Sequence, residues 1–164
     1  MRLFNGRDGE WTARIADAHR KGAVLELVAR TRAQASVPDL WLLFAPVKRQ
    51  KTDLIVEKAT ELGVREIHPV TTRRTQADRS KPERFHIIAK EAAEQTERLD
   101  LPEIAPGPAA LLVGPEGGFA PEERTRLRQL DFVRAVSLGP RILRAETAVI
   151  AALALWQAAR GDWA

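Results

Sequence analysis

The sequence contains no cysteine, and this absence removes several kinds of chemistry at once. Disulfide bonds, thiolate metal sites and covalent catalysis through a cysteine are all excluded. The chain also has only 3 histidines, and no spacing of histidine and acidic residues along it is typical of a metal-ligand set. We therefore expect no bound metal ion.

Long apolar runs are missing as well. The longest apolar stretches are too short or too interrupted to span a bilayer, and residues 1–6 lack the apolar core of a signal peptide. We therefore expect a cytoplasmic protein without a membrane partner.

Positive charge is in modest excess. The 164 residues include 26 lysines and arginines against 22 acidic residues, which gives a net charge of +4 and a pI near 9.9. Arginine dominates the basic residues, and its guanidinium group binds phosphate through two parallel hydrogen bonds. This composition favours a polyanionic partner, although a proteome rich in arginine would produce it too. The length is sufficient for one compact core and a small appended module.

The pattern of the chain changes near Pro38. Residues 11–17 and 23–30 are short runs separated by charged and glycine-containing turns, a pattern typical of a β-hairpin too small to be stable alone. After Pro38, apolar runs of strand length alternate with helical patterns, which predicts an α/β domain with a parallel sheet. The expected strands are residues 40–45, 64–70, 109–113 and 132–138.

Helical periodicity connects the first three of these strands. Thr52 or Asp53 is expected to cap a helix that ends at Gly63. A second helix is predicted over residues 83–98, with Arg98 on a charged face. The side chains expected to be buried in this second helix are Phe85, Ile88, Ala89, Ala92 and Ala93.

Two further helices are predicted towards the end of the chain. Pro121 suits the first position of a helix, and Glu122 and Glu123 in the following turn complement the helix dipole as capping residues. The final helix, residues 146–160, is almost wholly apolar from Ala148 to Trp156. We expect it to be buried or to form an oligomer interface.

Two glycine-proline loops, within residues 112–119 and 138–148, each follow an expected strand. Because ligands bind outside the carboxyl ends of parallel strands, these loops are expected to build one small-molecule pocket between them. Gly117 and Gly118 permit close backbone approach and offer N–H donors. The pattern matches neither a Walker loop nor a dinucleotide fingerprint. A backbone-lined adenosine pocket, a phosphate cradle and a plain strand-to-helix turn all remain open.

Four segments of the chain, residues 58–64, 91–98, 113–119 and 138–148, occur in an order that resembles a known family. The family is the bacterial 16S ribosomal RNA uridine-N3 methyltransferases of the SPOUT superfamily, and the resemblance spans residues 40–157. It implies a trefoil-knotted α/β domain, a homodimer and S-adenosylmethionine as methyl donor. The implied partner is 16S ribosomal RNA or the small ribosomal subunit.

The resemblance also implies two domains and a donor site. Residues 38–164 correspond to the methyltransferase domain. Residues 1–37 resemble only the later part of an N-terminal PUA-like RNA-binding β-barrel, and the linker of residues 102–108 is shorter than the family's. The implied donor-binding residues are Val113, Gly114, Pro115, Glu116, Gly117, Gly118, Leu138, Gly139, Ile142, Leu143 and Thr147.

Methylation at N3 requires that the uridine lose a proton and that the resulting anion be stabilised. Arg144, beside the second loop, is our first choice for stabilising this anion, ahead of Arg141 and Arg98. Glu116 and Glu146 are expected either to take the proton or to brace the loop and helix ends. The target base must be extruded or lie in a single-stranded region.

Two other functions fit the same resemblance. Relatives in the superfamily methylate the ribose 2′-hydroxyl, and a protein of this fold is also able to act as a non-catalytic RNA-binding assembly factor. Nucleoside analysis distinguishes the first from N3 methylation, and donor binding distinguishes the second.

Overall fold

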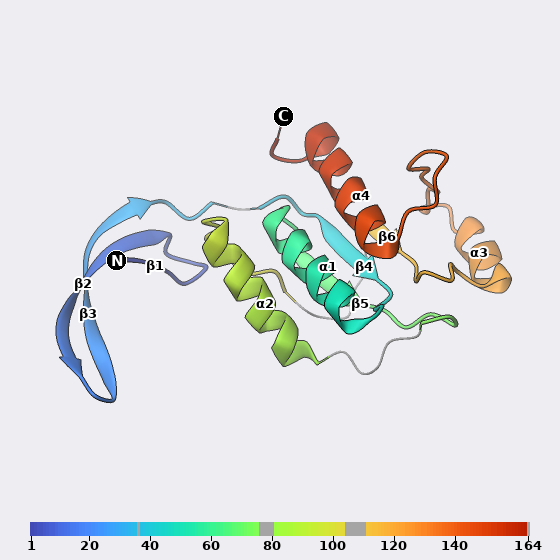
Figure 1. Ribbon diagram of the computed structural model, residues 1–164. Helices are drawn as coiled ribbons and strands as arrows, with labels where there is room; N and C mark the ends of the chain where they lie inside the picture. The colour runs from blue at the N-terminus through green and yellow to red at the C-terminus, as the bar shows by residue number, and fades with distance from the viewer. Residues whose placement is uncertain (36, 76–80, 104–110, 164) are drawn as a thin grey trace.

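The computed structural model describes residues 1–35, 37–75, 81–103 and 111–163, which form two separate sheets and four helices (Figure 1). An antiparallel sheet contains β1 (Arg2–Phe4), β2 (Glu10–His19) and β3 (Gly22–Arg32). A parallel sheet in the order β5-β4-β6 contains β4 (Trp41–Phe44), β5 (Glu66–Pro69) and β6 (Leu111–Val113). The helices are α1 (Arg49–Glu61), α2 (Pro82–Gln95), α3 (Pro121–Arg128) and α4 (Ala145–Arg160).

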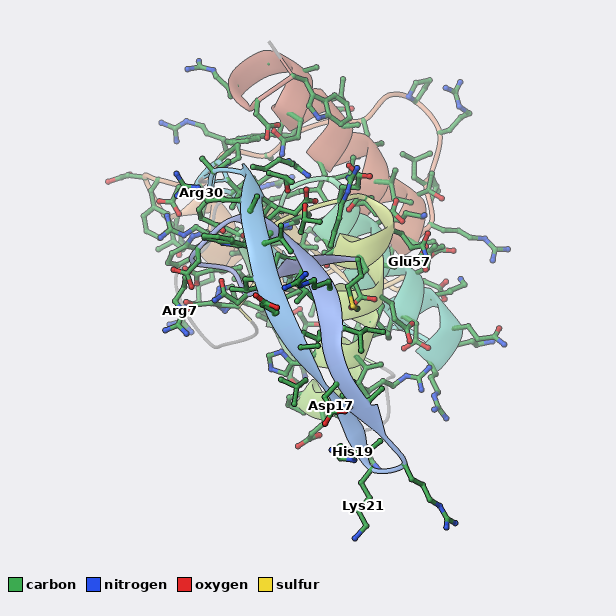
Figure 2. The ribbon with its side chains drawn as sticks, turned by 90° about the vertical axis from the view of Figure 1, so that its left-hand side faces the viewer. Arg7, Asp17, His19, Lys21, Arg30 and Glu57 are labelled. Atoms are coloured by element: carbon green, nitrogen blue, oxygen red, sulfur yellow. The ribbon has the colours of Figure 1, made fainter. Side chains whose placement is uncertain are left out.

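The β2–β3 hairpin confirms the predicted hairpin and extends it in both directions. It projects away from the helices, and its tip carries His19 and Lys21 (Figures 1 and 2). At its base, Glu10 is buried and accepts a hydrogen bond of 2.6 Å from Thr31. Arg32 donates to the backbone oxygen of Glu97, at 2.9 Å, just beyond the end of α2. The first of these bonds joins β2 to β3, and the second attaches the hairpin to the helical part of the molecule.

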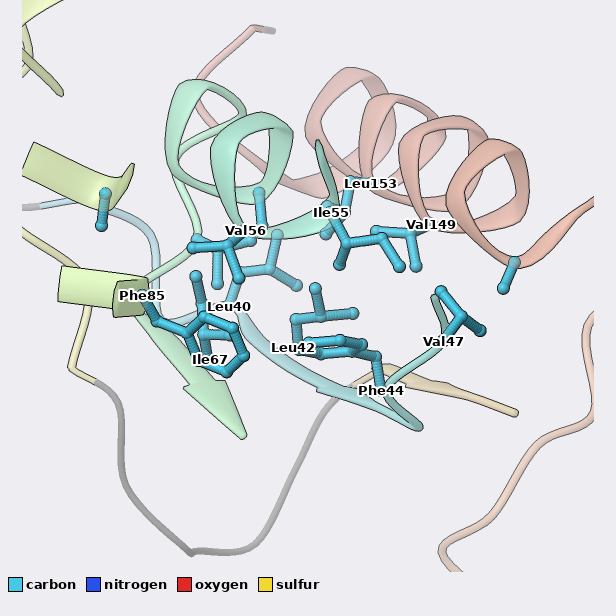
Figure 3. Packing of buried hydrophobic residues seen from close by; sticks show 14 residues of the cluster. Leu40, Leu42, Phe44, Val47, Ile55, Val56, Ile67, Phe85, Val149 and Leu153 are labelled. Carbon is cyan, nitrogen blue, oxygen red and sulfur yellow. The ribbon is translucent and has the colours of Figure 1, made fainter. Parts of the chain in front are cut away.

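The parallel sheet confirms the predicted α/β organisation. In the register, Leu42 of β4 lies beside Ile67 of β5 and Leu111 of β6. Side chains from α1, α2 and α4 pack on the sheet and form one hydrophobic core (Figure 3). The largest apolar side chains buried in this core are Leu40, Leu42, Phe44, Ile55, Val56, Ile67, Phe85, Val149 and Leu153.

Helix α1 begins earlier than predicted, at Arg49 instead of after Thr52 or Asp53. Thr52 is buried inside the first turn, where its hydroxyl accepts from the Val47 N–H and donates to the Val47 carbonyl, both at 3.0 Å. The prediction that Thr52 or Asp53 caps the helix is therefore wrong, because Thr52 lies inside the helix and binds the preceding loop. The predicted end is confirmed, since Gly63 follows the helix with a φ of +74°.

The predicted strand at residues 132–138 is wrong, because this segment contains no strand. Its backbone hydrogen bonds are local, as in the turn where Val133 donates to the Leu130 carbonyl at 3.0 Å. Phe132 and Val136 are largely exposed, at 82% and 76%. The alternation of apolar residues therefore does not correspond to packing against the parallel sheet within one chain.

The remaining helices agree closely with the prediction. Helix α2 buries Phe85, Ala89, Ala92 and Ala93 as expected, but it stops at Gln95, so Arg98 lies beyond it. Helix α4 starts one residue before the predicted position and buries Val149 and Leu153. Over the residues that the structure describes, no helix has the length and apolar character needed to cross a membrane.

Candidate functional site

The candidate site lies where the three parallel strands end. Because β4, β5 and β6 run in the same direction, the segments that follow them leave the sheet at one edge. The loop after β6 contains the first glycine motif, and β4 is followed by the short segment that leads into α1. The chain leaving β5 passes this glycine motif too, as the contacts of Arg74 below demonstrate.

The first glycine loop, residues 114–119, has a defined conformation. Gly118 donates to the Pro115 carbonyl at 2.8 Å and has a φ of +66°, a conformation that favours glycine. At Gly114 a side chain would meet the Phe119 ring at 2.9 Å, so only glycine lets this ring pack on the loop. Pro115 is buried, which anchors the turn while Glu116, Gly117 and Gly118 are exposed.

The segment after β5 holds this loop from one side. Arg74 donates to the Gly117 carbonyl at 2.7 Å, and the Arg73 N–H donates to Glu123 at 2.8 Å. Glu123 also accepts from the Ala120 N–H at 2.7 Å, so it caps α3 as predicted. These two N–H donors lower the pKa of the Glu123 carboxyl. The loop and the start of α3 are thus tied to the segment that follows β5, although β4 lies between β5 and β6 in the sheet.

A charged cluster connects the first loop to the start of α4. Lys51, in the first turn of α1, donates a hydrogen bond to Glu116 and lies 3.5 Å from the Glu146 carboxylate. The hydrogen bond lowers the pKa of Glu116 and raises that of Lys51. The nearby positive charge of Arg144 lowers the pKa of Glu116 further. Within the described residues, Oε2 of Glu146 is buried and has no hydrogen-bond partner.

The second glycine loop is held less tightly than the first. Gly139 has a φ of +99°, and its N–H donates to the Ser137 hydroxyl at 3.3 Å. Ile142 is fully exposed, whereas Leu138 and Leu143 are half-buried. The loop ends at Arg144, which is the N-cap of α4. The structure therefore brings Arg144 and Glu146 to the first loop but leaves Ile142 in solvent.

Arg98 occupies a different place from the other predicted site residues, and this corrects the expectation that it lies in the pocket. It is buried, donates to the Thr60 and Val64 carbonyls at 2.8 Å each, and forms two hydrogen bonds with Asp100. These partners lie at the end of α1 opposite Lys51, nine residues or about 13 Å along the helix. Glu97 adopts a φ of +55°, which ends the α2 region and turns Arg98 inward. These contacts hold the end of α1 and the turn after α2 together, which is a structural role.

Comparison with models of known protein families identifies the family to which this chain belongs. The model of the RNA methyltransferase domain matches residues 34–110 and 105–157, which include the parallel sheet and both glycine loops. The chain belongs to the RNA methyltransferase domain family.

Relatives of this RNA methyltransferase domain protein include the ribosomal RNA small subunit methyltransferase E of Rickettsia conorii, 31% identical over 94% of this chain and 78% of the relative. The enzyme of the same name from Neisseria gonorrhoeae, solved bound to S-adenosyl methionine, is 27% identical with a TM-score of 0.89, covering 100% of this chain and 84% of that one. A Legionella pneumophila methyltransferase with bound SAM is 30% identical with a TM-score of 0.86, covering 98% and 83%.

Two residues of this RNA methyltransferase domain site were absent from the sequence-based prediction. Lys51 joins the two loops through Glu116 and Glu146, and Arg74 holds the Gly117 carbonyl. Both lie just after the ends of expected strands, in the basic runs 48–51 and 73–74. The rule that singled out the glycine loops, proximity to a strand's carboxyl end, applies equally to these basic runs.

Proposed function

We propose that this chain transfers a methyl group from S-adenosylmethionine to N3 of a uridine in 16S ribosomal RNA. The observation that carries the proposal is the similarity, over nearly the whole chain, to two methyltransferase structures that hold S-adenosylmethionine. One of these is named for methylation of small-subunit ribosomal RNA, as is the relative from Rickettsia conorii. The two glycine loops are where the donor would bind.

The residues of the two loops fit such a donor. Gly118 and Gly139 both have a positive φ, and a Cβ atom added to either would have no atom of the described residues within 4 Å. Their backbones are thus open to close approach by a ligand. S-adenosylmethionine supplies an activated methyl group when bound. The residues that would hold it are those implied by the resemblance, Val113 to Gly118 in the first loop and Leu138, Gly139, Ile142, Leu143 and Thr147 around the second.

The charged residues have distinct parts in the proposed reaction. Arg144, exposed at the end of the second loop, would stabilise the anion that forms when uridine N3 loses its proton. Glu116 is a poor proton acceptor, because its bond from Lys51 lowers its pKa. Glu146 has one carboxylate oxygen without a partner in the described residues, and we assign it to accept the proton.

We propose the same architecture for this chain as the resemblance implies. Residues 1–37 would form a PUA-like RNA-binding module, supported by the separate antiparallel sheet of β1 to β3. Residues 38–164 would form the SPOUT methyltransferase domain with a trefoil knot. A homodimer is supported by exposed apolar side chains near the end of the chain, namely Phe132, Val136, Ile142 and Leu155. We also propose that the protein acts in the cytoplasm, which a ribosomal substrate supports.

The test is a methylation assay on small ribosomal subunits from a strain that lacks this gene. We expect incorporation of one methyl group, and digestion followed by mass spectrometry should identify 3-methyluridine. A product methylated on the ribose would replace the N3 proposal with 2′-O methylation. If calorimetry detects no donor binding while the protein still binds RNA, it is a non-catalytic assembly factor.

A further inference from the structure

Lys51 has an unusual position for a lysine on a surface helix. Its side chain is only 21% exposed, and its ammonium group contacts carboxylates from two other elements. Glu116 belongs to the first glycine loop, and Glu146 lies in the first turn of α4, directly after the second loop. One nitrogen therefore connects α1 to both of the loops that would hold the donor.

The cluster depends on this cation. Glu116 and Glu146 are both acidic, and both approach the same nitrogen, so without it two carboxylates would face each other across the gap between the loops. Like charges at such short range repel, which favours movement of one group or uptake of a proton; Arg144 and Lys48 also act on Glu116, but Lys51 is the cation that contacts both carboxylates. Lysine is charged at neutral pH, and the bond to Glu116 raises the pKa of Lys51 further.

We propose that Lys51 is a positioning residue that fixes the separation of the two glycine loops. It draws the first loop towards α4 through Glu116. Through Glu146 Oε1, at 3.5 Å, it orients that carboxylate, whose Oε2 is buried and has no hydrogen-bond partner in the described residues. This inference rests on the proposed function, because it assumes that the methyl donor binds between these loops. Lys51 itself acts through the two glutamates.

A second lysine of the same helix provides a matched control. Lys58 also contacts two carboxylates, Glu57 and Glu61, each at 2.8 Å, and its side chain is 33% exposed. All three residues belong to α1, so this cluster connects no other element. Replacing Lys58 removes the same kind of ion pairs without changing the relation between the loops.

The experiment compares Lys51→Met, Lys51→Arg and Lys58→Met with the parent protein. Calorimetry gives the dissociation constant of S-adenosylmethionine, steady-state assays on small subunits give kcat and the donor KM, and thermal unfolding reports stability. For Lys51→Met we expect donor Kd and KM to rise about tenfold to a hundredfold, because small displacements of binding groups are costly. Lys51→Arg, which keeps the charge, should recover part of this loss, and Lys58→Met should match the parent.

The outcomes separate this inference from the proposed function. If the parent binds no S-adenosylmethionine, the proposed function fails and the inference with it. If the parent and Lys51→Met bind the donor equally well, only the role of Lys51 is overturned. Should Lys51→Met fail to fold, Glu146→Gln breaks the same contact from the other side, and donor binding as tight as the parent's would then refute the proposal.

Discussion

Arg144 is the residue on which the proposed chemistry depends most directly. It is the N-cap of α4, where its carbonyl accepts from the Ala148 N–H at 2.8 Å, so its backbone is fixed while its side chain is exposed. Replacement by alanine should leave the backbone capping bond intact and remove only the guanidinium. The effect of this substitution therefore reports on chemistry more than on folding.

We expect Arg144→Ala to bind S-adenosylmethionine normally but to methylate small subunits about a hundredfold more slowly, a typical cost of losing charge stabilisation in a transition state. Arg144→Lys should recover only part of the rate, because lysine lacks the planar guanidinium fork. Arg126→Ala, an exposed arginine of α3, is the control for general loss of positive charge. A near-parental rate for Arg144→Ala would make Arg141 the better candidate.

Gly118 permits a second test at the scale of one residue. A Cβ atom at this position has no other atom of the described residues within 4 Å, so the main cost to stability comes from the φ of +66°, about 1–2 kcal/mol of unfolding free energy. Its side chain would also occupy the space proposed for the donor. We therefore expect Gly118→Val to bind S-adenosylmethionine much more weakly than the parent in calorimetry.

Gly117→Ala is the matched control for this substitution. The added carbon would lie 3.6–3.7 Å from Arg74, an ordinary contact, and Gly117 is not among the glycines with a positive φ. Its unfolding free energy should therefore stay close to the parent value. A Gly118→Val protein that folds and binds the donor as tightly as the parent would contradict the assignment of this loop.

At the scale of elements, Arg98 joins the end of α1, the segment that leads into β5 and the turn after α2. Its donors satisfy two buried carbonyls, and its ion pair with Asp100 is largely shielded from solvent. Arg98→Met would leave these acceptors without partners, and we expect the unfolding free energy to fall by about 3 kcal/mol. Denaturant titration measures this loss.

The same variant distinguishes a structural from a catalytic Arg98. At a temperature where Arg98→Met is still folded, its methylation rate per folded molecule should equal that of the parent. If Arg98→Met is stable but methylates much more slowly than the parent, Arg98 takes part in the reaction and its role is not only structural.

Element positions were predictable wherever apolar periodicity and burial agree. The parallel strands, the buried face of α2 and the whole of α4 follow from this pattern. The predicted start of α1 and the predicted end of α2 were wrong, because individual residues there have contacts or backbone angles that the apolar pattern does not reveal. Thr52 binds the preceding loop from inside α1, and the positive φ of Glu97 stops the helical pattern before Arg98. Helix propensities of single residues predict neither the contacts of Thr52 nor the backbone conformation of Glu97.

The candidate site was predictable only in part, for a related reason. Glycine and proline reveal a loop by their own backbone preferences, so both loops were recognisable. Lys51 could not be recognised from the local sequence, because the carboxylates that it contacts lie 65 and 95 positions further along the chain. Residues 132–138 have the apolar alternation of a strand, yet within the residues that the structure describes this segment pairs with no strand.

For the whole molecule, the proposed homodimer would account for the exposed apolar residues near the carboxyl end. We expect light scattering to give the mass of a dimer at micromolar concentration. Leu155→Glu, on the exposed side of α4, should shift the protein towards monomers, because it puts a charge into the proposed interface. Ile87→Glu is the control, since Ile87 of α2 and Leu155 are both 61% exposed. A parent protein that is purely monomeric would refute the dimer.

Because the β2–β3 hairpin is long, a small rotation at its base displaces its tip by a much larger distance. With strands of 10 and 11 residues it is about 33 Å long, so a rotation of about 10° at its base would carry its tip through roughly 6 Å. Its angle is set at the base, where Arg2 and Arg32 both lie within 3.8 Å of Glu10 and of Glu97. A slight loosening of these ion pairs is thus magnified into a displacement of several ångströms at the tip of the hairpin.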